Sequence, residues 1–223
     1  MDTELDVLTW QLIDSAFPAG AFAHSGGIES AIHHGLLQDH ESLKALLETM
    51  LQQIAISSVP LVLATHRDPR RFPDVDLFCD AFLTNHVANR ASRMQGGTFL
   101  TAVRQIFTRC EFDDLGLLIR SKKLPRHFST IFGVIAQSLG LDQTRCGHAF
   151  LFISLRGLIS AAVRLGATGP LEGQRLQIQL SKRFGLLMDI CKDLSIGEIA
   201  QTSPFLDMLQ GNQDRLYSRL FQS

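Results

Sequence analysis

Apolar residues in this chain recur at the spacing of a helix rather than of a strand. Between residues 39 and 57 they follow steps of three, one, three, one and three, at Leu43, Leu46, Leu47, Met50, Leu51 and Ile54. These steps place all the side chains on one face of a helix with 3.6 residues per turn. No stretch alternates apolar and polar residues, and no Asn-Gly or Asp-Gly pair marks a hairpin. The pattern predicts an all-α fold.

Capping residues and prolines predict where the helices begin and end. Asp39 is placed to cap the helix over residues 39–57, and Pro60 breaks or restarts it. Asp74 is placed to cap the following helix, and Pro125 fits the first turn of another. Further helices are expected over residues 89–107, 144–165 and 171–189 and from the Ser203-Pro204 pair onward, while residues 111–123 stay ambiguous.

The helix expected over residues 144–165 is apolar on nearly all sides, which is typical of the central helix of a bundle. Arg156 interrupts its apolar run, so the run is too short for a membrane span of about 20 residues. No linker or repeat divides the chain. We therefore expect one helical-bundle domain over residues 1–223, with no membrane contact.

Two adjacent glycines, Gly96 and Gly97, fall inside the helix expected over residues 89–107. They cost the helix about 2 kcal/mol relative to two alanines. Either the helix kinks there, or another part of the chain packs closely against the bare backbone.

Charge and cysteine content exclude several classes of protein. With 21 basic and 22 acidic residues the net charge is −1, so bulk charge does not attract nucleic acid. The four scattered cysteines do not form a disulfide framework, and no signal sequence begins the chain, which favours a cytoplasmic protein. Charged residues make up only 19% of the chain, which suggests that apolar surface is exposed to partners.

No motif in the sequence predicts chemistry by this chain alone. A phosphate-binding loop with its lysine is absent. His33 and His34 face apart on a helix, as do Cys146 and His148, so no metal site and no cofactor is expected. A transient contact between nickel and one histidine stays open. Ser25 and the adjacent His24 are the one candidate catalytic pair, but the sequence around Ser25 lacks the G-x-S-x-G motif of a nucleophile elbow.

Residues 11–29 are the hardest to explain by packing alone. Pro18 and Gly20 break a helix, and Ser25 is placed to cap the next one, with Glu29 in its first turns. Phe17, Phe22 and His24 crowd the short loop between them. Apolar residues on a loop indicate that the loop is packed or covered by a partner.

Four blocks in order resemble the UreF family of urease accessory proteins. The first runs from Gln11-Leu12 through Asp14-Ser15, Phe17-Pro18, Gly20, Phe22 and His24-Ser25-Gly26 to Glu29 and Ala31. The second is Asn89-Arg90-Ala91-Ser92-Arg93-Met94-Gln95-Gly96. The third joins His127-Phe128, Phe132-Gly133, Leu139-Gly140-Leu141, Ser160 to Gly166, and Gly173-Gln174. The last comprises residues 207–211 and 216–221.

This resemblance implies a dimeric all-α scaffold rather than an enzyme. It implies that the chain binds UreD (UreH in some systems) and recruits and regulates the GTPase UreG. The assembly then delivers nickel to the urease apoprotein. It also implies a C-terminal tail, residues 212–223, that is mobile alone and ordered against UreD.

The resemblance also assigns residues to contacts. The UreD contact falls on Tyr217, Arg219, Leu220 and Phe221, and an aromatic-arginine-apolar cluster of this kind is typical of interface hot spots. A dimer face or a UreG-facing surface falls on His24, Ser25, Gly26, Glu29, Arg90, Ser92, Gln95 and Gly96. Internal packing is the alternative role for both sets. A direct nickel-binding chaperone, a helical hydrolase using Ser25 and His24, and a helical adaptor unrelated to urease are the alternative functions.

Overall fold

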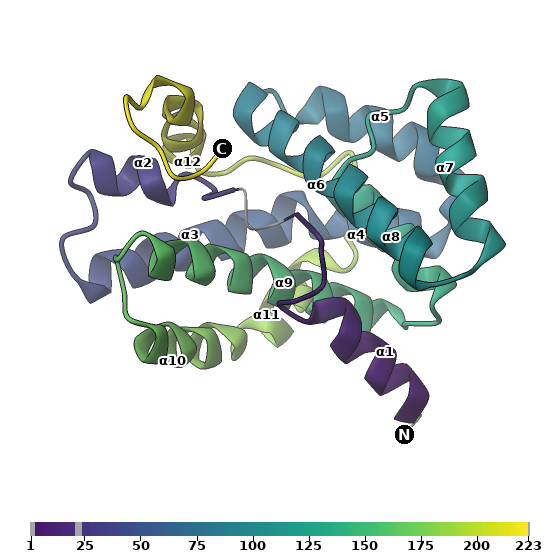
Figure 1. Ribbon diagram of the computed structural model, residues 1–223, viewed down its shortest axis with the longest axis horizontal. Coiled ribbons are helices and arrows are strands. Elements are labelled where there is room, and N and C mark those ends of the chain that lie inside the picture. Colours follow the sequence, from purple (N-terminus) through teal and green to yellow (C-terminus); the bar gives the residue numbers. More distant parts are fainter. Residues whose placement is uncertain (1–2, 21–23, 223) are drawn as a thin grey trace.

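The computed structural model describes residues 3–20 and 24–222, and these form helices and connecting loops with no strand. The prediction of an all-α fold is confirmed (Figure 1). The helices are α1 (Thr3–Ile13), α2 (Ile28–His33), α3 (His40–Ser57), α4 (Val59–Arg67), η2 (Pro69–Arg71), α5 (Phe72–Phe82), α6 (His86–Ile106), α7 (Cys110–Lys122), α8 (Phe128–Ser138), α9 (Gln143–Arg164), α10 (Pro170–Ser181), α11 (Phe184–Cys191), α12 (Pro204–Gly211) and η3 (Asn212–Arg215).

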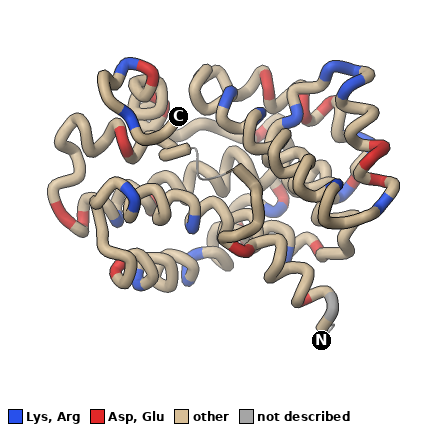
Figure 2. The backbone as a smooth tube through the Cα atoms, in the orientation of Figure 1, with Lys and Arg blue, Asp and Glu red and all other residues tan. Residues whose placement is uncertain are grey.

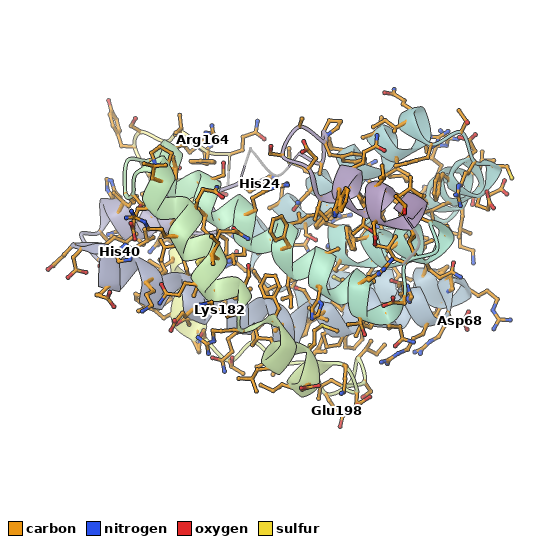
Figure 3. The ribbon with its side chains drawn as sticks, turned by 90° about the horizontal axis from the view of Figure 1, so that it is seen from below. His24, His40, Asp68, Arg164, Lys182 and Glu198 are labelled. Carbon is orange, nitrogen blue, oxygen red and sulfur yellow. The ribbon has the colours of Figure 1, made fainter. Side chains whose placement is uncertain are left out.

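Two groups of helices share one core. In one group α9 packs against α3, α10 and α11, and in the other α8 packs against α4, α5 and α6. Helix α4 also contacts α9 and so joins the groups. In Figure 1 α9 lies beside α3 in one half of the molecule, with α5, α6 and α7 in the other half. The carbon atoms of side chains fill the space between the helices (Figure 3). The polar residues His40, Asp68 and Glu198 lie at the outer edges of the molecule.

The most thoroughly buried helices are α4 and α8. Nine of the eleven residues of α8 are buried, from Phe128 to Ala136, against eleven of the 22 residues of α9. Helix α4 is buried from Val59 to His66. The prediction that α9 is a core helix is therefore confirmed, but the shorter α8 and α4 are more completely enclosed. Helix α8 packs against α4, α5 and α6, and α4 contacts both α8 and α9.

Arg156 does not make the apolar run too short for a membrane span, contrary to the prediction. Helix α9 continues through Arg156, and both Gln143–Arg164 and the stretch His40–Arg67 are long and apolar enough to cross a membrane. More than half of each apolar window is buried inside the protein, which is also the position of core helices in soluble proteins. The guanidinium of Arg156 donates to the carbonyl oxygen of Ile13, so α1 covers its charge.

The helix starts agree with the predictions where the capping residue is a neighbour in the sequence. Asp39 accepts from the Ser42 amide at 2.8 Å in a capping box, and Pro60 lies in the first turn of α4, so both predictions are confirmed. The prediction that Asp74 caps α5 is wrong, because the helix begins two residues earlier, at Phe72. Pro125 lies before α8 rather than in its first turn.

The expected helix over residues 171–189 is two helices, α10 and α11, separated at Lys182 and Arg183. The break falls on Lys182 and Arg183, neither of which is a glycine or proline, and Gly185 lies inside α11 rather than at the break. Residues 111–123, which stayed ambiguous, form most of α7.

Candidate functional site

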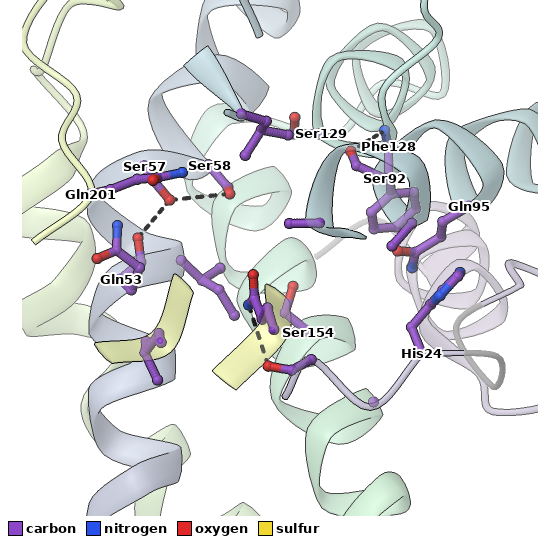
Figure 4. A pocket seen from close by; sticks show the side chains of 18 of the residues that line it. His24, Gln53, Ser57, Ser58, Ser92, Gln95, Phe128, Ser129, Ser154 and Gln201 are labelled. Carbon is purple, nitrogen blue, oxygen red and sulfur yellow. Dashed lines mark hydrogen bonds between the residues drawn. The ribbon is translucent and has the colours of Figure 1, made fainter. Parts of the chain in front are cut away.

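A cavity of about 260 Å³ opens between α3, α6, α8, α9 and α12 (Figure 4). The loop before α2 reaches its rim with His24 and Gly26. Ser92 and Gln95 face it from α6, so it gathers four of the predicted site residues. Its other polar lining comes from hydroxyl and amide side chains, including Gln53, Ser57, Ser58, Ser129, Ser154, Gln201 and Gln210. This volume holds several water molecules at about 30 Å³ each.

The ionisable groups around the cavity are tuned toward their neutral forms. Burial, and then the charge of Arg90, lower the pKa of the His24 imidazole. Burial raises the pKa of Asp207, which is the only carboxylic acid among the described lining residues. Burial also raises the pKa of the Cys79 thiol to about 12, so this thiol does not act as a nucleophile at neutral pH. The lining is mostly apolar, with uncharged polar groups among the apolar side chains, and suits neutral rather than charged groups.

Ser25 has a structural place in the turn that leads into α2. Its side chain is fully buried, and its hydroxyl oxygen accepts from the Gly27 amide at 3.3 Å. The N-cap position itself is Gly27, whose φ of 102° favours glycine, so the prediction that Ser25 caps the helix is wrong. Because its hydroxyl is buried, Ser25 lacks the exposure that a nucleophile paired with His24 requires. Phe22, which belonged to the predicted loop motif, lies outside the described residues.

Glu29 fastens the C-terminal segment, defined here as residues 212–222, to α2. Its carboxylate is buried and accepts from the backbone amides of Leu220 at 2.5 Å and Phe221 at 3.1 Å. The side chain of Gln213 donates to the same carboxylate at 2.5 Å. The segment therefore packs on its own domain through charge-assisted hydrogen bonds. Its mobility in isolation stays a prediction.

The four predicted UreD-contact residues divide into two environments. Phe221 is buried in the core cluster, and the guanidinium of Arg164 lies 4.4 Å from the centre of its ring. Tyr217 is fully exposed, Leu220 is 56% exposed, and Arg219 is also exposed. The segment is thus anchored at Phe221 and presents Tyr217 and Leu220 to solvent.

Asp214 joins the two predicted sets of site residues. Its carboxylate binds Arg90 on α6 through two hydrogen bonds, at 2.8 and 3.1 Å, and Arg219 on the C-terminal segment at 2.9 Å. His86 lies 3.2 Å away. The hydrogen bond from Arg90, followed by that from Arg219, outweighs burial and holds the pKa of Asp214 at about 2. The carboxylate therefore stays ionised at every physiological pH.

A buried polar network that the sequence analysis missed holds α5, α6 and α8 together. Asp76 is fully buried and accepts from the His127 amide at 2.8 Å and from the Thr130 hydroxyl at 2.6 Å. The His127 ring lies 3.0 Å from Asp80 through Nε2 and 3.1 Å from the Ser92 hydroxyl through Nδ1. Burial lowers the pKa of His127 despite the neighbouring carboxylates, so its ring is neutral.

This network has the residue types of a hydrolytic triad, but its geometry is that of a scaffold. The Ser92 oxygen accepts the Phe128 amide at 3.3 Å, and His127 is fully buried. One sequence signal pointed toward the network. Helix α8 begins after Pro125 without a capping Ser, Thr, Asp or Asn, so its free amides require an acceptor from elsewhere.

Gly96 and Gly97 are explained by close packing rather than by a kink. Helix α6 continues through both, and a Cβ atom on Gly96 would collide with the carbonyl oxygen of Arg126 and lie 2.8 Å from the backbone of Phe128. A Cβ atom on Gly97 would lie 2.9 Å from the Arg126 side chain. The pair makes room for the turn that leads into α8.

Among residues 3–20 and 24–222, no group of three His, Cys, Asp or Glu side chains could hold a metal ion. His33 and His34 lie with ring centres 5.4 Å apart on the exposed end of α2, with no carboxylate or thiol completing a site there. Cys146 is buried, and His148 stacks on Phe184. The direct nickel-binding alternative therefore has no preformed site in the part of the chain that the structure describes.

The fold and this site define an all-α protein with a cavity between its helices, lined by apolar and uncharged polar side chains, and a C-terminal segment folded back onto its second helix. The chain belongs to the UreF family, whose model matches residues 37–181.

Relatives from plants and bacteria agree over almost the whole chain. It is 35% identical to urease accessory protein F of Oryza sativa subsp. indica over 216 residues, covering 95% of this chain and 83% of the relative. It is 34% identical to urease accessory protein F of Arabidopsis thaliana, covering 96% and 91%. Urease accessory protein UreF of Paenarthrobacter aurescens (strain TC1) is 32% identical, with 96% of each covered.

Proposed function

We propose that this chain is a non-catalytic, cytoplasmic scaffold in urease assembly. It forms a homodimer, binds UreD (UreH) through its C-terminal segment, and presents the GTPase UreG to the urease apoprotein for nickel insertion. Membership of the UreF family and the names of the relatives support the role in urease assembly. The neutral cavity lining and the protonated Cys79 thiol agree with a protein that does not catalyse a reaction.

The arrangement of the C-terminal segment carries the UreD part of the proposal. Phe221 and Glu29 fix the backbone of the segment, while the side chains of Tyr217 and Leu220 are exposed and present apolar surface. Helix α12 packs against η3 at the start of the segment and exposes Met208 as well. An exposed aromatic residue on a fixed backbone binds a partner at low entropic cost.

Arg90 carries the proposed dimer or UreG-facing surface. Of the eight residues assigned to it, Arg90 alone has an exposed side chain, and Ser25, Glu29 and Gly96 are buried. His24, Gly26, Ser92 and Gln95 are half-buried around the cavity. Their proposed role is to shape this surface, while Arg90 contacts the partner.

A binding assay with purified UreD tests the proposal. Tyr217→Ala with Leu220→Ala removes the exposed apolar surface and leaves the anchor at Glu29. We expect the affinity for UreD to fall by at least about 30-fold, as for a hot-spot aromatic residue. Removing the last ten residues should abolish binding.

The matched control is Leu77→Ala with Leu117→Ala, which removes two similarly exposed leucines from α5 and α7. Unchanged binding in this control and lost binding in the segment variant support the proposal. Equal affinities for UreD in the wild-type chain and both variants would overturn the UreD contact.

A further inference from the structure

A second hollow lies on another face of the protein, between the start of α6 and the turn that joins α7 to α8. It measures about 900 Å³ and is lined by Asp80, Leu83, Thr84, His86, Asn89, Arg90, Arg93, Met94, Ile119, Arg120, Lys123, Leu124, Pro125 and Arg126. We call it the basic cleft, because five of these side chains are cationic and only one is a carboxylate. The whole chain has a net charge of −1, so this positive charge is local.

Three of the five cationic side chains form no ion pair with a described carboxylate. Arg90 binds Asp214, which lies outside the cleft lining, and Arg93 lies 3.6 Å from Asp80. Among the described residues, no carboxylate oxygen lies within 4.0 Å of a side-chain nitrogen of Arg120, Lys123 or Arg126. All three side chains are exposed. Figure 2 shows the end of α7, at the upper right of the molecule, as a stretch of basic positions.

Backbone conformation points to the same cations. Lys123 and Arg126 are the only described non-glycine residues with positive φ, at 53° and 64°. Lys123 occupies the position after α7 that usually holds glycine. Glycine would adopt this conformation without the steric conflict of a side chain. Two long cations held in strained positions of one cleft indicate a role for their charge.

The turn is also fixed in place. The Asp76 carboxylate accepts from the amides of Arg126 at 2.6 Å and His127 at 2.8 Å, and Leu124 donates to the Ile119 carbonyl. Asp76 thus occupies the two amides of the turn just before α8, and the Ser92 hydroxyl accepts from the first helical amide, that of Phe128, so these amides do not offer a phosphate site. A phosphate would contact only the flexible side chains of the lysine and arginines. Several carboxylates along a peptide would instead match the cations that are spread along the cleft.

We propose that the basic cleft binds an acidic segment of a partner protein. Arg120, Lys123 and Arg126 pair with its carboxylates, and the exposed Met94 packs against its apolar side chains. Arg90 and Arg93 retain their internal pairs. The basic cleft adjoins the C-terminal segment, because Arg90 and Met94 line both the cleft and a neighbouring hollow that Leu220 also lines. Arg120, Lys123 and Arg126 line only the cleft, so variants at these residues test the inference separately from the UreD contact.

Fluorescence anisotropy with the full chain tests this inference. The probe is a labelled short peptide of repeated Glu-Glu-Leu, with Gln-Gln-Leu as its uncharged match. We expect the glutamate peptide alone to bind, and more weakly as salt is raised. In Arg120→Gln with Lys123→Gly the affinity should fall by about tenfold, as for two lost exposed ion pairs. Because glycine relieves the strain at position 123, the melting temperature should stay constant or rise.

The control is Lys122→Gln with Lys182→Gln, which removes the same charge outside the cleft and should keep the affinity within about twofold of wild type. Arg126→Gln provides a second variant should the first fail to fold. The inference is overturned when both double variants lose affinity equally, or when the glutamine peptide binds as well. Competition by tripolyphosphate or single-stranded DNA at lower concentration than the peptide overturns it as well.

Discussion

Replacing Glu29 with glutamine should release the C-terminal segment while leaving the rest of the fold intact. The carboxylate accepts from the amides of Leu220 and Phe221 and from the side chain of Gln213. In either orientation, the glutamine NH₂ group faces at least one of these donors. The remaining hydrogen bonds lose their charge assistance.

The size of the effect follows from these contacts. A hydrogen bond to a buried charged group contributes about 1.5–3 kcal/mol, so losing one and weakening two costs about 3 kcal/mol. That energy corresponds to an approximately hundredfold change in the ratio of bound to released segment. The burial of Phe221 opposes release and is unchanged in the variant.

Hydrogen–deuterium exchange measures this ratio directly. The amides of Leu220 and Phe221 should exchange about a hundredfold faster in Glu29→Gln, while those of α8 keep their rates. Glu48→Gln is the matched control, because Glu48 forms a half-exposed ion pair with Arg183 at 3.2 Å and should contribute less than about 1 kcal/mol. Unchanged exchange at the segment, or equal acceleration in the control, would show that the Glu29 carboxylate does not hold the segment in place.

Two further predictions concern packing and protonation. Gly96→Ala forces a methyl group against the backbone of the turn before α8 and should lower the free energy of unfolding by about 1–3 kcal/mol in urea titrations. Gly157→Ala on α9 meets no neighbour and should be neutral or stabilising by up to about 1 kcal/mol; equal losses in both variants would contradict the packing account. Because the folded pKa values of His24 and His127 are lowered, only the unfolded chain takes up these protons as the pH falls through about 6.5. The melting temperature should therefore decrease when the pH is lowered from 7.5 to 5.5. The decrease should be smaller in His127→Asn. If the melting temperature of the wild-type chain instead rose as the pH was lowered, the histidines would not be buried as neutral rings.

The sequence determined the features that depend on neighbours along the chain. The helical periodicity of α3, the capping box at Asp39 and the restart at Pro60 follow from side chains within a few residues of one another. The Gly96-Gly97 pair indicated either a kink in the helix or close packing of another segment against its backbone. Only the structure showed that close packing occurs. Local signals failed at Pro125, because the cap of α8 comes from Asp76, 51 residues before His127.

The functional surfaces were decided by tertiary structure. Glu29 meets the amide of Phe221 across 192 positions of sequence, and Arg90 meets Asp214 across 124. Resemblance to the UreF family assigned Glu29, Arg90 and Phe221 to contacts, but it did not assign Asp214 and could not distinguish the buried Phe221 from the exposed Tyr217. The basic cleft likewise combines α6 with the turn after α7, and neither segment predicts it alone. Periodicity and capping are local interactions, whereas burial and electrostatic environment depend on which distant segments the folded chain brings together.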